Sequence, residues 1–207
     1  MWQEATRSLP GVFENTIFSR RSPVARSNYL KAMHPKTEIS PTAASIEKIL
    51  RAGWIGQIKI HGHRAQIHIP ADPKEDAIAY NRQGRPHKKL LPDEILLELR
   101  RILKLESDWT ILDSEWLKPE GKLYIFDILK ADGQNLRSLS YLERWKLLPK
   151  LYISPHVQTL PILTTVEKCL EILRGSDENV EGLVFKSKDT KGFADTSIVR
   201  CRKRSST

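Results

Sequence analysis

The 207-residue chain has little cysteine and no long apolar run. Its two cysteines, Cys169 and Cys201, do not build a disulfide framework, so we expect a reducing compartment. A membrane-spanning helix needs about 20 consecutive apolar residues, which the sequence does not offer, so we expect no membrane partner. An apolar signal core is also missing, and Glu4 and Glu14 count against an organelle transit peptide. These absences favour an intracellular protein, cytoplasmic or nucleoid-associated, over an organelle protein.

Acidic residues are outnumbered by basic ones. The 34 lysines and arginines against 25 acidic residues give a net charge of +9. An excess of this sign favours a polyanionic partner such as nucleic acid or a nucleotide. The hydrophobic content of 40% and the charged content of 29% are ordinary for a globular protein, and the length suits one well-packed domain.

The hydrophobic pattern divides the chain into an arm and a domain. Residues 1–40 show no sustained periodicity and contain three prolines, which predicts a loosely structured arm. Residues 41–207 are predicted to form one domain that contains both helices and strands. A capping box of Thr164 with Glu167 is expected to begin one of these helices. The predicted helices cover residues 41–52, 92–105, 141–148 and 165–174, and the predicted strands cover residues 109–116, 122–129 and 180–186.

A change of strand parity marks the segment around Lys59. Apolar residues fall on even positions up to Ile60 and on odd positions from Ala65 onward, so the chain turns between them. Gly62 can adopt the backbone conformation that such a turn requires. We therefore predict a hairpin with Lys59 near the end of its first strand and Arg64 at the start of its second. On pattern alone, a lysine in a strand is more often part of a solvated face.

Residues 59–64, which read KIHGHR, resemble the KxDGxR signature of the covalent nucleotidyltransferases. This superfamily includes ATP-dependent DNA ligases, RNA ligases and mRNA capping enzymes. His61 replaces the usual aspartate, as it does in some RNA ligases. A metal cluster of His61, His63 and His68 is disfavoured, because residues that flank a turn need not converge. The resemblance implies that the Lys59 amine attacks the α-phosphate of ATP and forms a lysyl-AMP intermediate.

Further segments resemble the other signatures of the superfamily in the family's order. Residues 81–85 resemble the SRNG-type element, residues 113–115 the D-G-E element, and residues 126–127 the FD element. Residues 181–186 match EGxxxK, and residues 197–204 resemble the closing K-x-K element with arginines in place of lysines. The resemblance implies that the nucleotide is bound by Gln57, Arg64, Arg82, Glu115, Phe126, Lys186, Arg200 and Arg202.

Several assignments stay open at this level. Glu181 is the expected carboxylate for Mg²⁺, which prefers hard oxygen ligands. Gln57 occupies the place of a glutamate that reads the adenine amino group in many ligases, so the choice of base is unsettled. The last motif fits either Arg200 with Arg202 or Arg202 with Arg204. For Phe126 the alternative is ordinary core packing, and for the closing arginines it is a basic tail.

The resemblance implies that residues 41–207 form an α+β nucleotidyltransferase (adenylation) domain of antiparallel sheets with flanking helices. It also implies an ATP-dependent polynucleotide ligase that seals nicks, and the sequence after Phe126 favours DNA over RNA. The alternatives are an RNA ligase, a GTP-dependent capping-type enzyme, and a non-catalytic relative that binds nucleic acid. Ligases and capping enzymes of this superfamily carry a C-terminal OB-fold domain, and this sequence ends just after its last motif. We therefore expect a minimal ligase, a domain of a longer protein, or a partner that supplies the OB-fold function.

Overall fold

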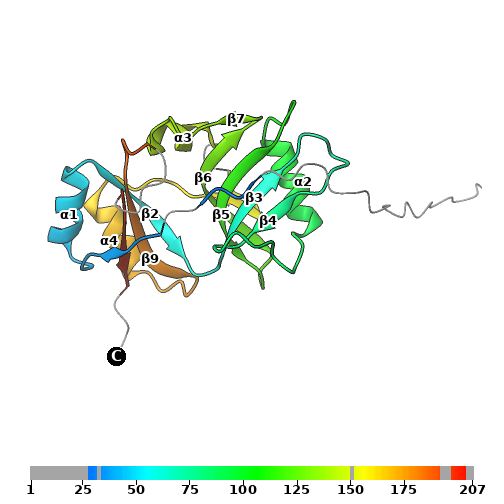
Figure 1. Cartoon of the computed structure of the whole chain (residues 1–207). Coiled ribbons are helices and arrows are strands. Elements are labelled where there is room, and N and C mark those ends of the chain that lie inside the picture. The colour runs from blue at the N-terminus through cyan, green and yellow to red at the C-terminus, as the bar shows by residue number, and fades with distance from the viewer. Residues whose placement is uncertain (1–27, 32–33, 150–151, 192–196, 204–207) are drawn as a thin grey trace, which may run out of the picture.

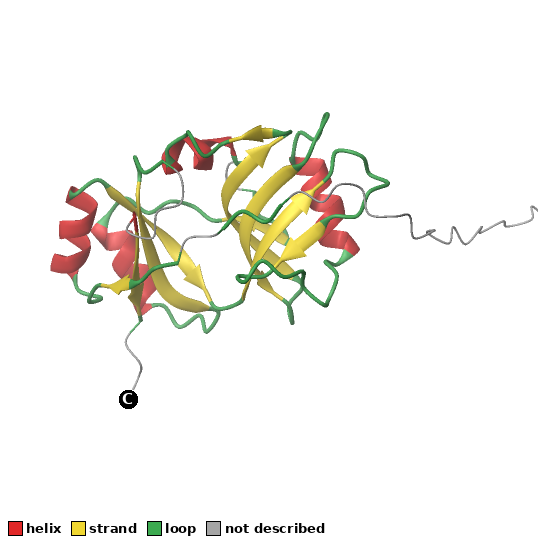
Figure 2. Cartoon of the chain, viewed as in Figure 1, coloured by secondary structure: helices red, strands yellow, loops and turns green. Residues whose placement is uncertain are grey.

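The computed structural model describes residues 28–31, 34–149, 152–191 and 197–203. Most of the predicted arm, together with Arg204, lies outside these described residues. The chain forms two β-sheets that face each other, with helices on their outer faces (Figures 1 and 2). This is the α+β fold with antiparallel sheets and flanking helices that the sequence predicts.

The small sheet has four strands in the order β1-β10-β9-β2, and only the β1–β10 pair is parallel. Its outer face is covered by α1 and α4 through the buried side chains of Ile46, Cys169 and Phe185. Cys169 therefore serves as a small core residue, as its helical spacing predicts. The elements of this half are β1 (Thr37–Glu38), α1 (Ala43–Arg51), β2 (Trp54–Ile60), α4 (Val166–Arg174), β9 (Val180–Ser187) and β10 (Ile198–Arg202).

The large sheet has six strands in the order β4-β3-β5-β6-β7, with β8 added in parallel to β6. Helix α2 packs on its outer face, where Ile95 and Leu99 are fully buried against Ile67 and Leu112. These apolar residues alternate with polar ones that face the other sheet. The elements of this half are β3 (His63–Ile69), β4 (Ile78–Tyr80), α2 (Asp93–Ile102), β5 (Thr110–Leu117), β6 (Lys122–Ala131), β7 (Gln134–Asn135) and β8 (Val157–Thr159).

Helix α3 (Tyr141–Leu147) lies at the junction of the two sheets (Figure 1). Ser140 and Glu143 form the predicted capping box at its start. The fully buried Arg144 makes two hydrogen bonds of 2.9 Å to the Asp127 carboxylate on β6. These contacts fix α3 against the large sheet.

The predicted hairpin around Lys59 is wrong. The chain does turn at residues 61–62, but β2 pairs with β9 in the small sheet, while β3 pairs with β4 and β5 in the large sheet. A parity change predicts a turn without saying whether the two strands pair afterwards. The structure also gives a steric reason for glycine at position 62, in addition to the turn. A Cβ there would lie only 2.9 Å from Leu117 and 3.0 Å from Glu115.

The start of α4 also differs by one residue from the prediction. Thr165, not Thr164, is the N-cap, and its side chain accepts a hydrogen bond from the Lys168 amide. The two-residue strands β1 and β7 are too short to produce a periodic pattern. No helix formed by the described residues is long and apolar enough to cross a membrane.

Candidate functional site

A cavity of about 530 Å³ lies between the facing sides of the two sheets. All ten residues that the sequence proposes for the site contribute to its lining, although they are spread over more than 140 positions of the chain. Asp113 and Asp127 line it as well. The ten residues are Gln57, Lys59, Arg64, Arg82, Glu115, Phe126, Glu181, Lys186, Arg200 and Arg202.

The parity change between β2 and β3 explains how neighbouring strands both supply polar groups. On β2 the polar side chains that line the cavity, Gln57 and Lys59, are at odd positions, and Ile58 and Ile60 contribute apolar lining. On β3 the even position Arg64 faces it, because the chain has moved to the opposite sheet. A continuous alternation would have directed one of these two sets into an apolar core.

Lys59 lies at the end of β2, opposite Gly182 of β9, and Gly182 is in turn opposite Arg202 of β10. Gly182 has a φ of 147°, and a Cβ there would clash with the carbonyl oxygen of Cys201. Only glycine lets the three strands approach so closely. The Lys59 ammonium forms an ion pair with the Glu181 carboxylate, and the two side chains are 23% and 29% exposed.

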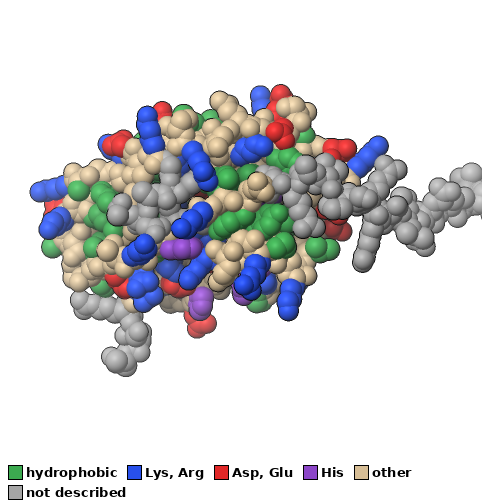
Figure 3. Space-filling view, in the orientation of Figure 1, with side chains coloured by type: hydrophobic (Ala, Val, Ile, Leu, Met, Phe, Trp, Pro, Cys, Tyr) green, Lys and Arg blue, Asp and Glu red, His purple; other side chains and the backbone are tan. Residues whose placement is uncertain are grey.

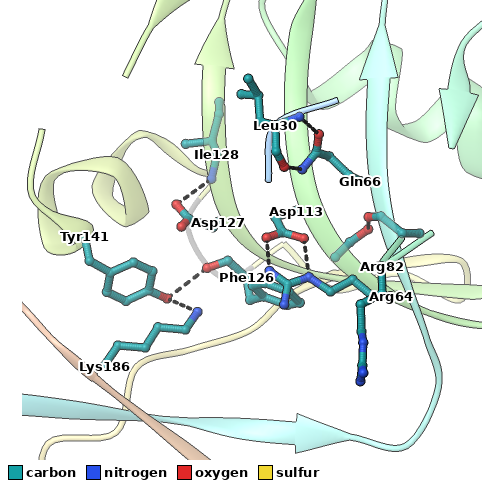
Figure 4. Close-up of polar contacts among 12 residues, drawn as sticks. Leu30, Arg64, Gln66, Arg82, Asp113, Phe126, Asp127, Ile128, Tyr141 and Lys186 are labelled. Atoms are coloured by element: carbon teal, nitrogen blue, oxygen red, sulfur yellow. Dashed lines mark hydrogen bonds and ion pairs between the residues drawn. The ribbon is translucent and has the colours of Figure 1, made fainter. Parts of the chain in front are cut away.

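Lys186 is buried at the inner end of the cavity. Its Nζ donates a hydrogen bond of 2.9 Å to Gln57 Oε1. It donates another of 3.2 Å to the Tyr141 hydroxyl (Figure 4). The same nitrogen lies 4.5 Å from the centre of the Phe126 ring. Burial lowers the pKa of Lys186 to about 8, although Asp127 opposes this shift.

The large sheet supplies an arginine held by a carboxylate. Arg64 bonds Asp113 in a bidentate manner, with its Nε 2.9 Å from Oδ1 (Figure 4). Its guanidinium lies 5.2 Å from the centre of the Phe126 ring. Glu115 is opposite Arg64 in the strand register, and burial raises the pKa of Glu115 to about 7 against the opposing charges of Arg64 and Lys59.

The two arginines of the last motif meet a carboxylate from the start of the described chain. Arg200 Nε lies 2.7 Å from Glu38 Oε2, and Arg202 Nη1 lies 3.6 Å from the same oxygen. Arg200 and Arg202 both line the cavity, which is the first of the two registers that the sequence leaves open. Arg204 lies outside the described residues. Figure 3 shows Lys, Arg and His side chains gathered over the middle of the molecule.

The described residues contain no group of three or more His, Cys, Asp or Glu side chains that could hold a metal ion. Of the cavity carboxylates, Asp113 and Asp127 are bonded to Arg64 and Arg144. Mg²⁺ is commonly held by only one or two carboxylates together with substrate phosphates. Glu181, which lies beside Lys59 at the cavity surface, fits that pattern of binding.

Sequence reasoning missed Tyr141 and Arg144. Each is fully buried in a short helix, where an aromatic residue suggests core packing and an arginine suggests a solvated face. Their partners lie on distant strands, so no local pattern signals them. Asp113 and Asp127 lie within the recognised motifs, but the sequence does not show that they pair with Arg64 and Arg144.

Comparison with known proteins shows the family and the fold of this chain. A family model for RNA ligase matches residues 52–203, and no curated protein matches the sequence. A solved structure of a mycobacterial DNA ligase D complexed with ATP and MES is similar, with a TM-score of 0.54 and 20% identity over 83% of this chain. A structure from work on Lig E DNA ligases is also similar, with a TM-score of 0.51 and 14% identity. The match covers 85% of this chain and 70% of the Lig E chain. This chain spans 60% of the DNA ligase D structure, and at these identities the likeness is one of fold.

Proposed function

Because the chain belongs to the RNA ligase family, we propose that it is an ATP-dependent polynucleotide ligase domain in which Lys59 carries a covalent AMP. The observation that supports this most strongly is the shared cavity: Lys59 lines it together with Lys186, Arg200 and Arg202. Arg64 and Arg82 line the cavity as well, so one amine lies at the surface of a pocket with five further lysine and arginine side chains, which suits attack on a phosphate. ATP is the proposed nucleotide, and the similar DNA ligase D structure was solved with ATP.

The first step forms a bond between Lys59 Nζ and the α-phosphorus of ATP. The bond from that phosphorus to the bridging oxygen breaks, and pyrophosphate leaves with its electron pair. An ammonium has no lone pair, so the ion pair with Glu181 must separate and Lys59 must lose a proton first. Lys59 and Glu181 are 23% and 29% exposed, so solvent at the cavity mouth can take this proton.

Charge on the leaving pyrophosphate is the main electrostatic demand of this step. Lys186, Arg200 and Arg202 are the cavity cations that would stabilise it. Glu181 would hold Mg²⁺, which supplies further positive charge to the phosphate oxygens when it is bound. Phe126 would face the purine ring, and Glu115 would accept a hydrogen bond from the ribose hydroxyl once ionised.

In the later steps the AMP moves to a nucleic-acid 5′-phosphate, and an adjacent 3′-hydroxyl displaces it. The net charge of +9 suits such a polyanionic acceptor. We favour nicked DNA because the sequence after Phe126 resembles DNA ligases. RNA ligation is the second candidate, since the matching family model is that of RNA ligase and His61 fits some members.

Incubation with α-labelled ATP tests the proposal. We expect a labelled adduct in the wild type and in a control variant, Lys168→Ala, whose exposed lysine lies on the outer helix α4. Lys59→Ala should reduce labelling by more than about a thousandfold, because the nucleophile is gone. Labelled GTP distinguishes a capping-type enzyme, and nicked DNA and RNA acceptors distinguish the two ligases. Undiminished labelling of Lys59→Ala would contradict the proposal.

A further inference from the structure

The hydroxyl of Tyr141 lies where three strands of the cavity wall meet helix α3. It is 2.5 Å from Gln57 Oε1 on β2, 2.8 Å from the carbonyl oxygen of Phe126 on β6, and 3.2 Å from Lys186 Nζ on β9. The side chain is almost fully buried, and Figure 4 shows it directed toward Lys186 and Phe126. One hydroxyl therefore contacts both sheets and two side chains that face the nucleotide cavity.

The donors and acceptors of this network determine which way the carboxamide group of Gln57 points. Its Oε1 is the acceptor for Lys186 at 2.9 Å and for the Tyr141 hydroxyl at 2.5 Å, which uses both lone pairs. The amide nitrogen of Gln57 is therefore on the other side, where it donates to the Leu160 carbonyl at 3.4 Å. Without Tyr141, only Lys186 would hold the carboxamide oxygen in this position.

The helix that carries Tyr141 is itself held firmly. Arg144 binds the Asp127 carboxylate through two hydrogen bonds of 2.9 Å and donates a third to the Leu139 carbonyl at 2.9 Å. Trp145, on the same helix, donates to the same Leu160 carbonyl that receives the Gln57 amide. Because these contacts fix helix α3, the Tyr141 hydroxyl has a fixed position and can hold the flexible Lys186 side chain in place.

A phenylalanine would fill the same apolar space, so packing alone does not require the hydroxyl. A buried hydroxyl is unfavourable unless it is hydrogen-bonded, and each partner of this one belongs to the cavity wall. We propose that Tyr141 is a positioning residue whose hydroxyl holds Gln57 and Lys186 as one unit and sets how both side chains face the nucleotide. This inference rests on the proposed function and adds a residue that no sequence motif marks.

The network also affects the charge of Lys186. Burial lowers its pKa to about 8; the charges of Asp127 and Asp113 oppose this shift, and those of Arg64 and Arg144 add to it. The Gln57 and Tyr141 oxygens that accept hydrogen bonds from Nζ also favour the protonated form. Removal of the Tyr141 hydroxyl takes away one acceptor, so the pKa should fall further. The fraction of charged Lys186 at neutral to mildly alkaline pH then decreases, and with it the stabilisation of the leaving pyrophosphate.

The test compares Tyr141→Phe with the matched control Tyr152→Phe, whose hydroxyl bonds Glu98 and Arg101 on α2. The rate of adduct formation is measured from pH 6 to 10 in both variants and in the wild type. Tyr141→Phe should move the alkaline limb of the profile down by about one pH unit and slow the reaction about fivefold at pH 8. Tyr152→Phe should follow the wild-type profile. A Tyr141→Phe profile that superimposes on the wild type would overturn the inference.

A second readout needs no activity. NMR of isotope-labelled lysine side chains gives the titration midpoint of Lys186, which should fall by about one unit in Tyr141→Phe and stay unchanged in Tyr152→Phe. If the wild type forms no adduct, the proposed function fails while this titration still decides the role of Tyr141. Should Tyr141→Phe not fold, Gln57→Leu removes a partner of the same hydroxyl and should also lower the midpoint. An unchanged midpoint in the folded variant overturns the inference.

Discussion

The two walls of the cavity hold their charged groups in different ways. On the large sheet, Arg64 and Asp113 pair with side chains that are 16% and 5% exposed. Asp127, 4% exposed, pairs with the fully buried Arg144 of α3. On the small sheet the pairs are open to water: Lys59 with Glu181 at 23% and 29%, and Arg200 with Glu38 at 31% and 38%.

This difference indicates a division of roles between the two walls. Removing one partner of an ion pair that is shielded from water strongly destabilises a protein, because the other charge stays buried. The large sheet therefore provides a fixed frame. Exposed pairs contribute little to stability and separate readily, so a phosphate can replace the carboxylate partners on the small sheet. The proposed nucleophile Lys59 lies on this second wall, together with Lys186, Arg200 and Arg202, which we propose to contact the phosphates. Substitution of one partner in each type of pair tests the division.

Asp127→Ala should have the largest effect on stability. It leaves the Arg144 guanidinium buried without its carboxylate, which should lower the free energy of unfolding by about 3 to 5 kcal/mol. Thermal unfolding should shift down by about 10 °C for a chain of this length. The double variant Asp127→Leu/Arg144→Met should recover much of the loss, because neither buried charge remains. A shift of Asp127→Ala no larger than that of a surface substitution would contradict the fixed-frame role.

Glu115→Gln should have an intermediate effect that depends on pH. Burial raises the pKa of Glu115 from 4.5 to about 7, so in this window the unfolded chain is ionised while the folded one keeps the proton. The contribution of Glu115 to the free energy of unfolding is therefore fully present below pH 4.5, and it is lost as the pH rises through about 7. Glu115→Gln should gain about 1 to 3 kcal/mol relative to the wild type between pH 4.5 and 8.

Urea unfolding of Glu115→Gln and the wild type at several pH values measures this difference. Parallel stability curves would show that Glu115 titrates alike in the folded and unfolded chains. Glu167→Gln, on the exposed side of α4, is a suitable control because it removes a carboxylate far from the cavity.

Glu38→Gln should have the smallest effect on stability. Its ion pair with Arg200 is open to water, so the free energy of unfolding should change by less than about 1 kcal/mol. Nucleotide binding should improve by about two- to fivefold, because Arg200 and Arg202 no longer have the competing carboxylate. The dependence of adduct formation on ATP concentration measures this change. Weaker binding in Glu38→Gln would mean that Glu38 orients the arginines instead of competing with the phosphates.

Much of the candidate site could be predicted because most of the motifs are short segments of single strands, while residues 59–64 span the turn from β2 to β3 and residues 81–85 form a turn after β4. Lys59 was correctly placed near the end of a strand, and Glu115, Phe126 and Glu181 also lie on predicted strands. Their gathering in one cavity followed from the order of the motifs in the family. The capping box at Ser140 was also predictable, since it involves residues three positions apart.

Contacts between distant segments could not be predicted. Tyr141 bonds Gln57 across 84 positions, and Arg200 bonds Glu38 across 162 positions. The same limit explains the hairpin error, because alternation within β2 and β3 does not reveal that they join different sheets. Local periodicity reports which face of a strand is apolar, and only the assembled sheets determine what lies opposite the other face.

The most direct test of the account is to locate AMP on the protein after incubation with ATP. The wild type is digested, and peptide mass spectrometry identifies the modified residue. We predict one AMP on Lys59 of the small sheet and none on Lys186, whose buried amine contacts Gln57 and Tyr141. AMP on Lys186 or on any other residue, or no adduct at all, would contradict the assignment of Lys59 as the nucleophile.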